Sequence, residues 1–386
     1  MSFRGVYFSR LLPTHKLGGG SRRTMQIYEM LRTIDSEFQV ISCARDDRIP
    51  KKVRKKINHM SQRKIFLALS GLSSSLRRWS EEHRGMVYRL RKFSEFWAQA
   101  VSELPELDLA ILDDPIYFQP LFKKLLRLHI PVIAVCQNLE ALSPRQVKKN
   151  RAPGLFRDEL KLLSQCRSVI TISREEDVLL NNFGIRSIFI PYHPVEPILG
   201  RLLAIRETRK HSSKEGILMV GTTRNPATRE GVVRAASYWY QNCLDRAAGK
   251  LIIGGYKSES FFDPRPFGSS VDFRGTLTDE EMDRLLSRVK ALLCYQESGA
   301  GALTRICEML IAGVPVLANP HAARSYYHRK GVIEFRELDE LGEALKQTDV
   351  FDGEIPLPQA PRISPLSLEI QRILHENSHD LAGARY

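Results

Sequence analysis

Short apolar runs of four to six residues recur along the chain, and a helix-like segment with polar positions follows most of them. Runs of this length that alternate with helical periodicity are typical of a doubly wound α/β fold with parallel strands. The pattern predicts two such sheets, one in each half of the chain. The predicted strands are 5–9, 38–43, 107–112, 131–136 and 168–173 in the first half, and 216–221, 250–255, 271–275, 291–295 and 314–318 in the second.

A proline-rich stretch, residues 190–200 (IPYHPVEPILG), separates the two series of strands. Closely spaced prolines prevent regular structure, so this stretch is expected to be a linker. A chain of 386 residues also exceeds the size at which one core keeps growing. We therefore expect an N-terminal Rossmann-like domain over 1–195 and a C-terminal one over 196–352. A proline-rich link and a C-terminal helix over 353–386 are expected to pack back on the N-terminal domain.

Two helix starts carry capping signals. Ser21 precedes an apolar stripe that includes Met25 and Leu31, and is expected to cap that helix. Thr278 and Glu281 have the spacing of a capping box. Both helices should bury their apolar stripes in a core.

Composition narrows the class of protein. The six cysteines (43, 136, 166, 243, 294 and 307) form no C-x-x-C pair and no Cys/His cluster, which indicates a reducing cytoplasm and no zinc site. The N-terminus lacks the long apolar region of a signal peptide, and no apolar run approaches the roughly 18 to 20 residues that span a bilayer. We expect a cytoplasmic protein, soluble or peripheral on the inner face of the cell membrane.

Nearly all of the net charge of +14 lies in residues 48–92, which contain 14 Lys and Arg but only two acidic residues, Glu81 and Glu82. Such a segment suits an anionic partner. Apolar residues such as Phe66 and Trp79 are interleaved with the cations, which favours an anionic membrane surface. A solvated helical face is the simpler alternative. No zinc-finger or RNA-binding motif accompanies the charge, so no nucleic-acid partner is expected.

The candidate chemistry lies in residues 289–319, VKALLCYQESGAGALTRICEMLIAGVPVLAN. The turn ESGAGA follows a predicted strand, and ligands of parallel sheets bind at the carboxyl ends of strands. Gly299 and Gly301 allow the backbone to approach a ligand, and a helix that begins near Ala302 directs its N–H groups there. Arg305 on its first turn adds a cation suited to phosphate oxygens. The turn therefore predicts a phosphate site.

Glu308 lies one helical turn beyond Arg305 and on the same side of that predicted helix. A carboxylate would repel phosphate but accepts two hydrogen bonds from a ribose diol. A phosphate site next to a ribose site predicts a nucleotide ligand.

These residues resemble the donor-binding motif of GT-B glycosyltransferases of the family-4 type, G-x-G-x-x-T-R-x-x-E-x-x-x-x-G-x-P-V. The matching positions here are Gly299, Gly301, Thr304, Arg305, Glu308, Gly313, Pro315 and Val316. Five further blocks are similar to that family in order and spacing, namely 17–23, 135–142, 166–176, 217–232 and 271–282. The resemblance runs from about residue 4 to residue 348.

The resemblance implies two facing Rossmann-like domains with a cleft between them. It also implies transfer of a sugar from a nucleotide-diphosphate sugar to an acceptor hydroxyl, with retention and without a metal or other cofactor. Family members often assemble surface polysaccharide, lipopolysaccharide or glycolipid on phosphorylated or lipid-linked glycan acceptors. Charge that develops on the departing β-phosphate would be stabilised by Arg305, Arg224 and a helix N-terminus.

The resemblance also assigns residues to roles. The implied donor-binding residues are Gly18, Gly19, Gly20, Gly221, Arg224, Gly275, Gly299, Ala300, Gly301, Thr304, Arg305 and Glu308, of which Arg305 and Arg224 are also the catalytic cations. The implied residues on the acceptor or sugar side are Gln137, Asn138 and Glu140. No metal ligand is implied.

The sequence departs from the family at two positions and leaves alternatives open. Ala300 stands where many relatives have a glutamate, and Gln137 stands where they have a histidine. A non-catalytic nucleotide-sugar-binding protein and a same-fold nucleotide-sugar epimerase are the alternatives. Arg229 is the alternative to Arg224 as the second cation.

Other polar residues fall near the expected sites. Asp113 and Asp114 end a predicted strand, where they suit an acceptor hydrogen bond or a structural cap better than Mg²⁺. His15, Tyr192 and His193 flank these segments, but a lone histidine is more often structural.

Overall fold

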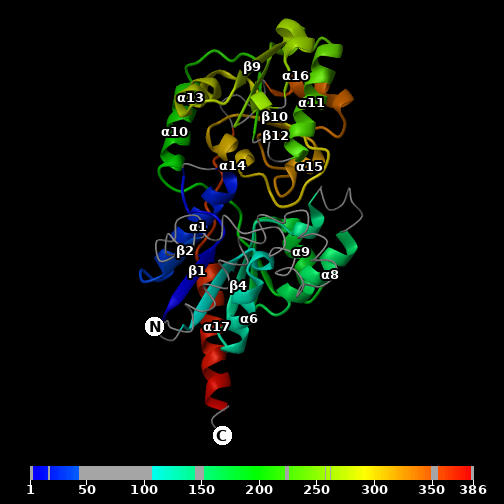
Figure 1. The fold of residues 1–386 in the computed structure, drawn as a ribbon. Coiled ribbons are helices and arrows are strands. Elements are labelled where there is room, and N and C mark those ends of the chain that lie inside the picture. Colours follow the sequence, from blue (N-terminus) through cyan, green and yellow to red (C-terminus); the bar gives the residue numbers. More distant parts are fainter. Residues whose placement is uncertain are drawn as a thin grey trace, which may run out of the picture. The chain divides into compact units, whose positions relative to one another are not determined.

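The computed structural model describes residues 3–15, 18–42, 107–143, 152–221, 226–256, 258–260, 262–348 and 355–383. The chain divides into two compact units (Figure 1). The first comprises residues 1–191 together with 361–386, and the second comprises 192–360. The basic segment 48–92 lies outside the described residues.

The first unit is built on a six-stranded parallel sheet with the order β2-β1-β3-β4-β5-β6. The central Tyr7 pairs with Val40 on one side and with Ile111 on the other. The chain leaves β1 in one direction to form β2 and later returns to its other side to form β3. The strands are β1 Gly5–Ser9, β2 Gln39–Ser42, β3 Leu109–Asp113, β4 Val132–Cys136, β5 Ser168–Thr171 and β6 Ser187–Phe189.

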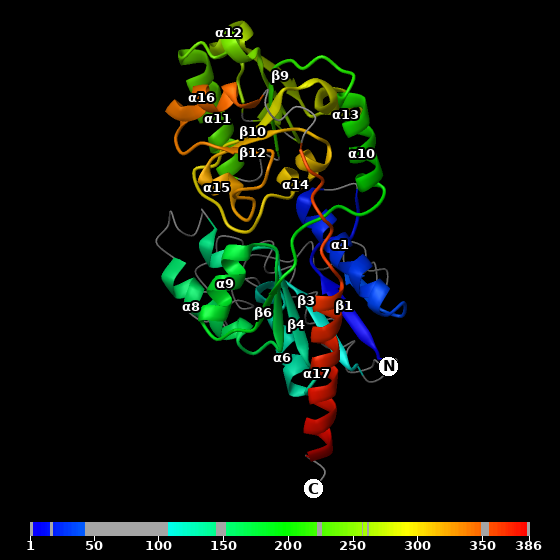
Figure 2. The ribbon, with the colours of Figure 1, turned by 180° about the vertical axis from the view of Figure 1, so that it is seen from behind.

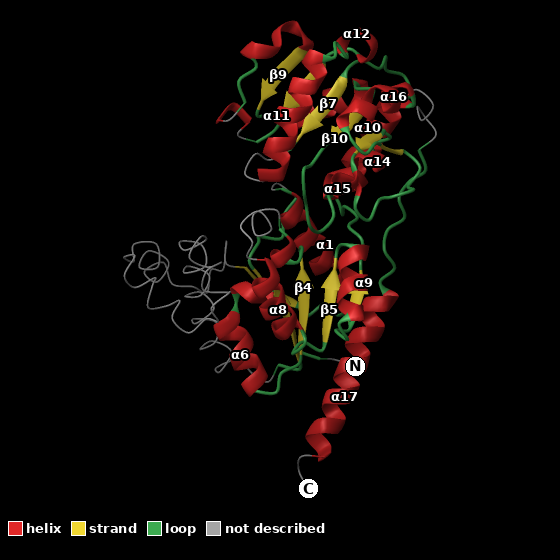
Figure 3. Cartoon of the chain, turned by 90° about the vertical axis from the view of Figure 1, so that its right-hand side faces the viewer, coloured by secondary structure: helices red, strands yellow, loops and turns green. Residues whose placement is uncertain are grey.

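Side chains alternate between the two faces of this sheet, as the period of a strand requires. Val6 and Phe8 belong to a core shared with α6 (Gln119–Arg127), α8 (Ala152–Leu163) and α9 (Arg174–Asn182). Tyr7 belongs to the opposite core with α1 (Gly19–Ile34). Figure 3 shows α6 and α8 on one side of the sheet and the C-terminal helix on the other. Both faces are covered, which explains why the strands are apolar throughout.

The C-terminal helix α17 (Ser364–Gly383) belongs to the first unit (Figure 2). Leu366, Ile370 and Ile373 lie in the same core as Tyr7 and the apolar face of α1. An ion pair also joins the helix to the sheet, since Arg186, just before β6, donates to both oxygens of Glu369 at 2.7 and 2.8 Å. The C-terminal helix is therefore part of the domain that the N-terminal residues form.

The second unit has a six-stranded parallel sheet with the order β12-β11-β10-β7-β8-β9. Strand β7 comes first in the chain and lies next to β10, while β8 and β9 lie on its other side. The strands are β7 Ile217–Val220, β8 Leu251–Gly254, β9 Val271–Gly275, β10 Ala291–Cys294, β11 Val316–Ala318 and β12 Val332–Glu334.

One face of this sheet packs against α11 (Pro226–Gln241) and α16 (Leu341–Lys346), and the fully buried Trp239 lies in that core. In a second group of helices, α10 (Ile198–Arg209) packs against α13 (Asp279–Arg288) and α14 (Thr304–Ile311). Arg209 connects these helices because it donates to the carbonyls of Val289 and Gly313 at 2.8 and 3.0 Å. The short helices α12 (Asp245–Ala248) and α15 (Pro320–Ala323) complete the unit.

Ten predicted strands are confirmed, and two strands were missed. The missed strands, β6 and β12, have three residues each and lie at sheet edges. The capping box of Thr278 and Glu281 is present in α13. The expected cap at Ser21 is wrong, because α1 begins two residues earlier with Gly18 as its N-cap. The proline-rich stretch is irregular only to residue 197, since α10 begins at Ile198. In the described parts of the chain, no helix is both long and apolar enough to cross a bilayer.

Candidate functional site

The topology of the second unit indicates where a ligand binds. From β7 the chain continues to β8 on one side, and from β10 it continues to β11 on the other side. The two connections therefore leave the neighbouring strands β7 and β10 in opposite directions. The carboxyl ends of two such strands form a crevice in open α/β sheets, and ligands bind there. This switch point lies between Val220 and Cys294.

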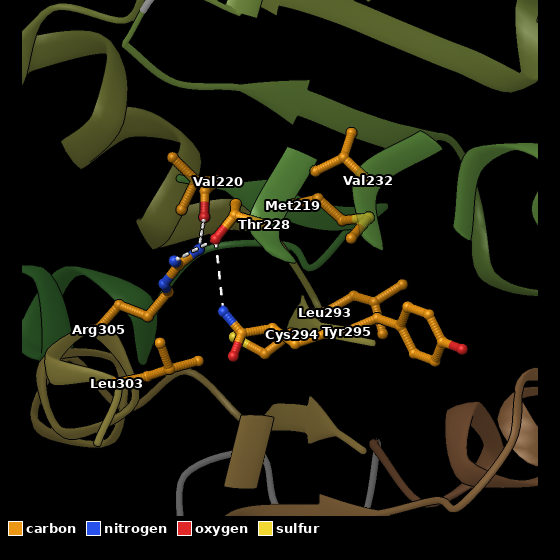
Figure 4. Close-up of a pocket in the computed structure, with 10 residues that line it drawn as sticks. Met219, Val220, Thr228, Val232, Leu293, Cys294, Tyr295, Leu303 and Arg305 are labelled. Atoms are coloured by element: carbon orange, nitrogen blue, oxygen red, sulfur yellow. Dashed lines mark hydrogen bonds between the residues drawn. The ribbon is translucent and has the colours of Figure 1, made fainter. Parts of the chain in front are cut away.

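A small hollow lies at this switch point (Figure 4). Its wall is apolar except for three side chains, those of Thr228, Gln296 and Arg305. The remaining lining residues are Met219, Val220, Val232, Leu293, Cys294, Tyr295 and Leu303. An apolar wall with a few convergent polar groups is the usual make-up of a small-molecule site.

Arg305 reaches the hollow from the first turn of α14. Its Nη1 donates to the Val220 carbonyl, and its Nη2 donates to the Thr228 hydroxyl at 3.3 Å. A Cβ added to Gly221 would overlap the guanidinium, which explains why a glycine follows β7. The cation is therefore fixed at the switch point, with its fork of N–H donors at the end of β7.

Gln296 is a residue of this site that sequence reasoning missed. Asn319, after β11, accepts from the Gln296 backbone N–H at 3.0 Å and donates to its carbonyl at 2.7 Å. The Gln296 amide donates to the Thr228 hydroxyl at 3.4 Å, and its buried Oε1 has no hydrogen-bond partner among the described residues. The only sequence signal was a polar residue directly after an apolar strand.

The predicted glycine turn follows Gln296. Gly301 has a φ of +68°, a backbone conformation that side chains disfavour. The side chain of Arg324 donates to the carbonyls of Ala300 and Gly301 at 3.1 and 3.0 Å. Helix α14 then begins at Thr304, and its N-cap residue makes no side-chain cap bond. The turn and the helix start therefore present backbone N–H groups near Arg305, as an anion site requires.

Glu308 lies one turn into α14 and is 7% exposed. The hydroxyl of Tyr192 donates to its Oε1 at 2.7 Å. This bond holds the carboxylate in one orientation. The sequence placed Tyr192 near the site but did not indicate this pairing.

Gly275, another predicted donor residue of the second unit, does not line the hollow. Gly275 ends the edge strand β9 with a φ of +67°, and the next residue, Thr276, donates its hydroxyl to Glu259 at 3.1 Å. Arg224 lies outside the described residues. The alternative cation, Arg229, is exposed on α11.

The predicted glycine loop of the first unit leads into α1. Gly18 is the N-cap of α1, and its carbonyl accepts from the Ser21 N–H at 3.0 Å. A Cβ at Gly18 would meet nothing within 4 Å, whereas one at Gly20 would lie 2.7 Å from Leu11. Gly19 is the first residue of the helix. The loop thus has open space at Gly18 and close packing at Gly20.

The first unit has its own switch point, between β1 and β3. Asp113 ends β3 and accepts from the Ser9 hydroxyl at 2.8 Å and from the Gln137 amide at 3.2 Å. Asp114 accepts from Arg10 at 2.8 Å and from the Gln137 backbone N–H at 3.1 Å. Burial raises the pKa of both carboxyl groups, and the Arg10 guanidinium opposes that effect. This network joins Gln137 to the paired aspartates.

Glu140 joins the same network through Tyr117. The Tyr117 hydroxyl donates to Glu140 at 2.7 Å, and the Arg10 guanidinium lies 4.4 Å from the centre of the Tyr117 ring. Asn138 is half-buried in the loop after β4. Sequence reasoning did not identify Arg10 or Tyr117. No group of three potential metal ligands occurs among the residues that the structure describes.

Two buried glutamates hold the loop that carries these residues. The carboxylate of Glu159, in α8, accepts from the N–H groups of Glu140 and Ala141 at 2.9 and 3.0 Å. Glu176, in α9, accepts from the Leu139 N–H at 3.2 Å. Burial raises the pKa of Glu159 to about 8, although the two N–H bonds oppose the rise. The loop after β4 is thus fixed by side chains from two helices.

The two histidines differ in setting. His193 is buried, with Nδ1 3.0 Å from the Pro194 carbonyl, which is a structural contact. His15 lies in the loop before α1, where its carbonyl accepts from Arg22 at 3.3 Å.

Two parallel six-stranded sheets with flanking helices define a protein of the GT-B fold, with two Rossmann-like domains. The structure is similar to sucrose-phosphate synthase from Thermosynechococcus elongatus, with a TM-score of 0.61 and 12% identity over 99% of this chain and 98% of that one. It is also similar to the catalytic domain of starch synthase IV from Arabidopsis thaliana, bound to ADP and acarbose, with a TM-score of 0.61 and 11% identity over 98% and 99% of the two chains.

A third similar structure is Anabaena HepE in complex with UDP-glucose, with a TM-score of 0.57 and 12% identity over 98% of this chain and 99% of that one. No protein-family model matches the sequence, and no curated protein matches it. At these identities the structural likeness shows the fold, and the predicted GT-B fold class is confirmed.

Proposed function

We propose that this protein is a glycosyltransferase that moves a sugar from a nucleotide-diphosphate sugar to an acceptor hydroxyl. The observation that carries the proposal is the placement of Arg305 and the start of α14 at the β7/β10 switch point. Two of the similar structures are complexes with UDP-glucose and with ADP, which supports a nucleotide ligand here.

In the proposed site the diphosphate lies against the glycine turn and the N-terminus of α14. Arg305 and the backbone N–H groups neutralise the charge that grows on the β-phosphate as the bond to the sugar breaks. The bonds to Val220 and Thr228 hold the guanidinium in place before the reaction, so little reorganisation is needed. Arg224 is proposed as the second cation. In this mechanism the cations of the chain do the work that a metal ion does in other transferases.

The ribose diol is assigned to Glu308. Its carboxylate accepts a bond from Tyr192, and two-point recognition of a diol requires a carboxylate held in one orientation. Gly221, which follows β7 at the switch point, completes the donor site proposed for the second unit.

The acceptor hydroxyl is assigned to the network of the first unit. Gln137, Asn138 and Glu140 follow β4 at the carboxyl edge of that sheet, where carboxylate and amide groups can bind sugar hydroxyls. We further propose retention at the anomeric carbon, on the resemblance of the sequence to family-4 enzymes, and an acceptor in surface polysaccharide, lipopolysaccharide or glycolipid assembly.

A thermal-shift panel with UDP, ADP, GDP, their glucose conjugates and the parent nucleosides tests the proposed donor site. A ligand present at 100 times its dissociation constant stabilises the folded state by about 2.7 kcal/mol. We expect at least one nucleoside diphosphate to raise the Tm and the parent nucleoside to have no effect. If no member of the panel shifts the Tm, the proposal is wrong.

We also propose that the basic segment 48–92 binds an anionic membrane surface. Each cation near an anionic bilayer contributes about 1 kcal/mol, so four or five engaged residues suffice for reversible binding. We expect sedimentation with phosphatidylglycerol vesicles, weakened by salt, and none with phosphatidylcholine vesicles. Replacement by Gln of Lys51, Lys52, Arg54, Lys55 and Lys56 should abolish it. Equal binding to both vesicles, or to neither, would leave the segment as a solvated face.

A further inference from the structure

The segment after β11 holds the loop after β10 at two points. At the first point, Asn319 makes two hydrogen bonds with the backbone of Gln296. At the second, Arg324 donates from Nε to the Gly301 carbonyl at 3.0 Å and from Nη2 to the Ala300 carbonyl at 3.1 Å. The loop between Gln296 and Gly301 is therefore fixed at both ends by one neighbouring segment.

The guanidinium of Arg324 also fits against the turn sterically. A Cβ added to Gly299 would overlap its nitrogen atoms, so the close approach depends on a glycine at that position. Its Nη1 donates to the His321 carbonyl, in α15. A planar guanidinium that bonds three carbonyls has a fixed orientation, which a lysine ammonium would not reproduce.

These bonds determine which way the turn faces. In a trans peptide the C=O and N–H groups point in opposite directions. Because the carbonyls of Ala300 and Gly301 point to Arg324, the N–H groups of Gly301 and Ala302 point away from it. Those N–H groups directly precede α14, whose first turn carries Arg305.

We propose that Arg324 is a positioning residue of the donor site, which orients the turn Gly299–Gly301 so that its N–H groups face the diphosphate. The inference rests on the proposed function and adds a residue to it. Arg324 does not touch the ligand in this account. It acts through the backbone of the turn, and its positive charge behind the turn adds to the attraction for an anion.

The first test compares Arg324→Ala and Arg324→Lys with a matched control, Arg206→Ala. Arg206 lies in the same unit and also donates to carbonyls, those of Ile311 and Ile355 at 3.1 and 3.0 Å, but at the far end of α14. We expect Arg324→Ala to weaken binding of UDP and of inorganic pyrophosphate by about tenfold to a hundredfold in isothermal titration calorimetry. Arg324→Lys should lose less, and Arg206→Ala should lower the Tm while leaving both affinities unchanged.

The second test separates positioning from direct contact. Gly299→Ala places a methyl group against the guanidinium and should weaken binding on its own. In the Arg324→Ala background the same change should have little further effect, because the group that it would displace is gone. If the losses of binding free energy in Gly299→Ala and Arg324→Ala simply add in the double variant, Arg324 does not act through the turn and the proposal is overturned.

Hydrogen exchange gives a readout that needs no ligand. Amide exchange in residues 297–303 should become faster in Arg324→Ala but not in Arg206→Ala. A wild-type protein that binds neither UDP nor pyrophosphate would overturn the proposed function, and exchange alone would then decide whether Arg324 holds the turn. Exchange equal to that of the wild type in Arg324→Ala would overturn the inference.

Discussion

In the first unit, the switch point between β1 and β3 carries three carboxylates, those of Asp113, Asp114 and Glu140, around one cation, Arg10. In the second unit, the switch point between β7 and β10 carries Arg305 with neutral polar groups beside it. Both crevices lie where the strand order reverses in a parallel sheet of six strands.

The comparison separates what the topology decides from what the side chains decide. A reversal of strand order places loops and helix starts at a crevice in both units. The choice of ligand then follows from charge. Carboxylates and amides suit the hydroxyl groups of a sugar, whereas a fixed guanidinium beside a helix N-terminus suits a diphosphate. We therefore assign the acceptor to the first crevice and the donor to the second.

The largest effect is expected from Arg305→Ala. Removal of one charge-stabilising donor from such a site lowers the rate by about a hundredfold to a thousandfold. Release of nucleoside diphosphate from the nucleotide sugar should fall by that factor, and Arg305→Lys should be intermediate. The matched control is Arg265→Ala, whose exposed side chain pairs with Asp263 at the surface. Near-normal turnover in Arg305→Ala would remove this residue from the proposed mechanism.

The next effect concerns Glu308→Gln. The amide keeps an acceptor for Tyr192 but loses the second acceptor oxygen that a ribose diol requires. UDP affinity should fall by about tenfold or more, and activity should fall with it. Binding of inorganic pyrophosphate, which has no ribose, should be unchanged in calorimetry. An equal loss of affinity for UDP and for pyrophosphate would show that Glu308 supports the structure of the site and does not bind the ribose.

A third prediction concerns the stability of the acidic crevice. Asp114 is 4% exposed and pairs with the half-buried Arg10, so Asp114→Asn removes a carboxylate from this guanidinium. Burial of Asp114 offsets part of the attraction, and Arg10 keeps Asp113 and Glu140 nearby, so we expect a loss of about 1 kcal/mol. Urea denaturation should show this loss, and the double variant Arg10→Gln/Asp114→Asn should recover part of it. The exposed ion pair between Arg265 and Asp263 offers the control, since Asp263→Asn should not change the free energy of unfolding measurably.

The smallest expected effect is a change in pH dependence at Glu159. Its pKa is raised to about 8 in the folded protein, so the folded state keeps this proton over a range in which the unfolded chain has lost it. Its contribution to stability is complete below the unfolded value of about 4.5 and is lost as the pH rises through about 8. The difference in unfolding free energy between the wild type and Glu159→Gln should therefore decrease over that range. A difference that is independent of pH would contradict the raised pKa.

The strand pattern could be predicted from sequence because both sheets are buried on both faces. Most of the ten predicted strands are apolar runs of four or five residues, whereas β6 and β12 have only three residues each. The start of α1 could not be predicted from capping preferences, because the glycines at 18–20 take the place of the expected Ser21 cap.

The candidate site was predictable only where its residues are close in sequence. The turn, Arg305 and Glu308 lie within ten residues and could be assigned together. Gln296, Arg324 and Tyr192 could not, because their partners are brought to them by tertiary structure. Arg10 was missed for the same reason, since its partner Asp114 is 104 residues away.

The assignment of donor and acceptor to different crevices is tested most directly by one set of titrations on the full-length chain. UDP, ADP and GDP are titrated into the wild type, Arg305→Ala and Asp114→Asn under conditions where all three are folded. The account predicts that the wild type and Asp114→Asn bind the same nucleoside diphosphate with affinities within about threefold of each other, whereas Arg305→Ala binds it at least about tenfold more weakly. Loss of binding in Asp114→Asn with binding retained in Arg305→Ala, or no binding by the wild type, would contradict it.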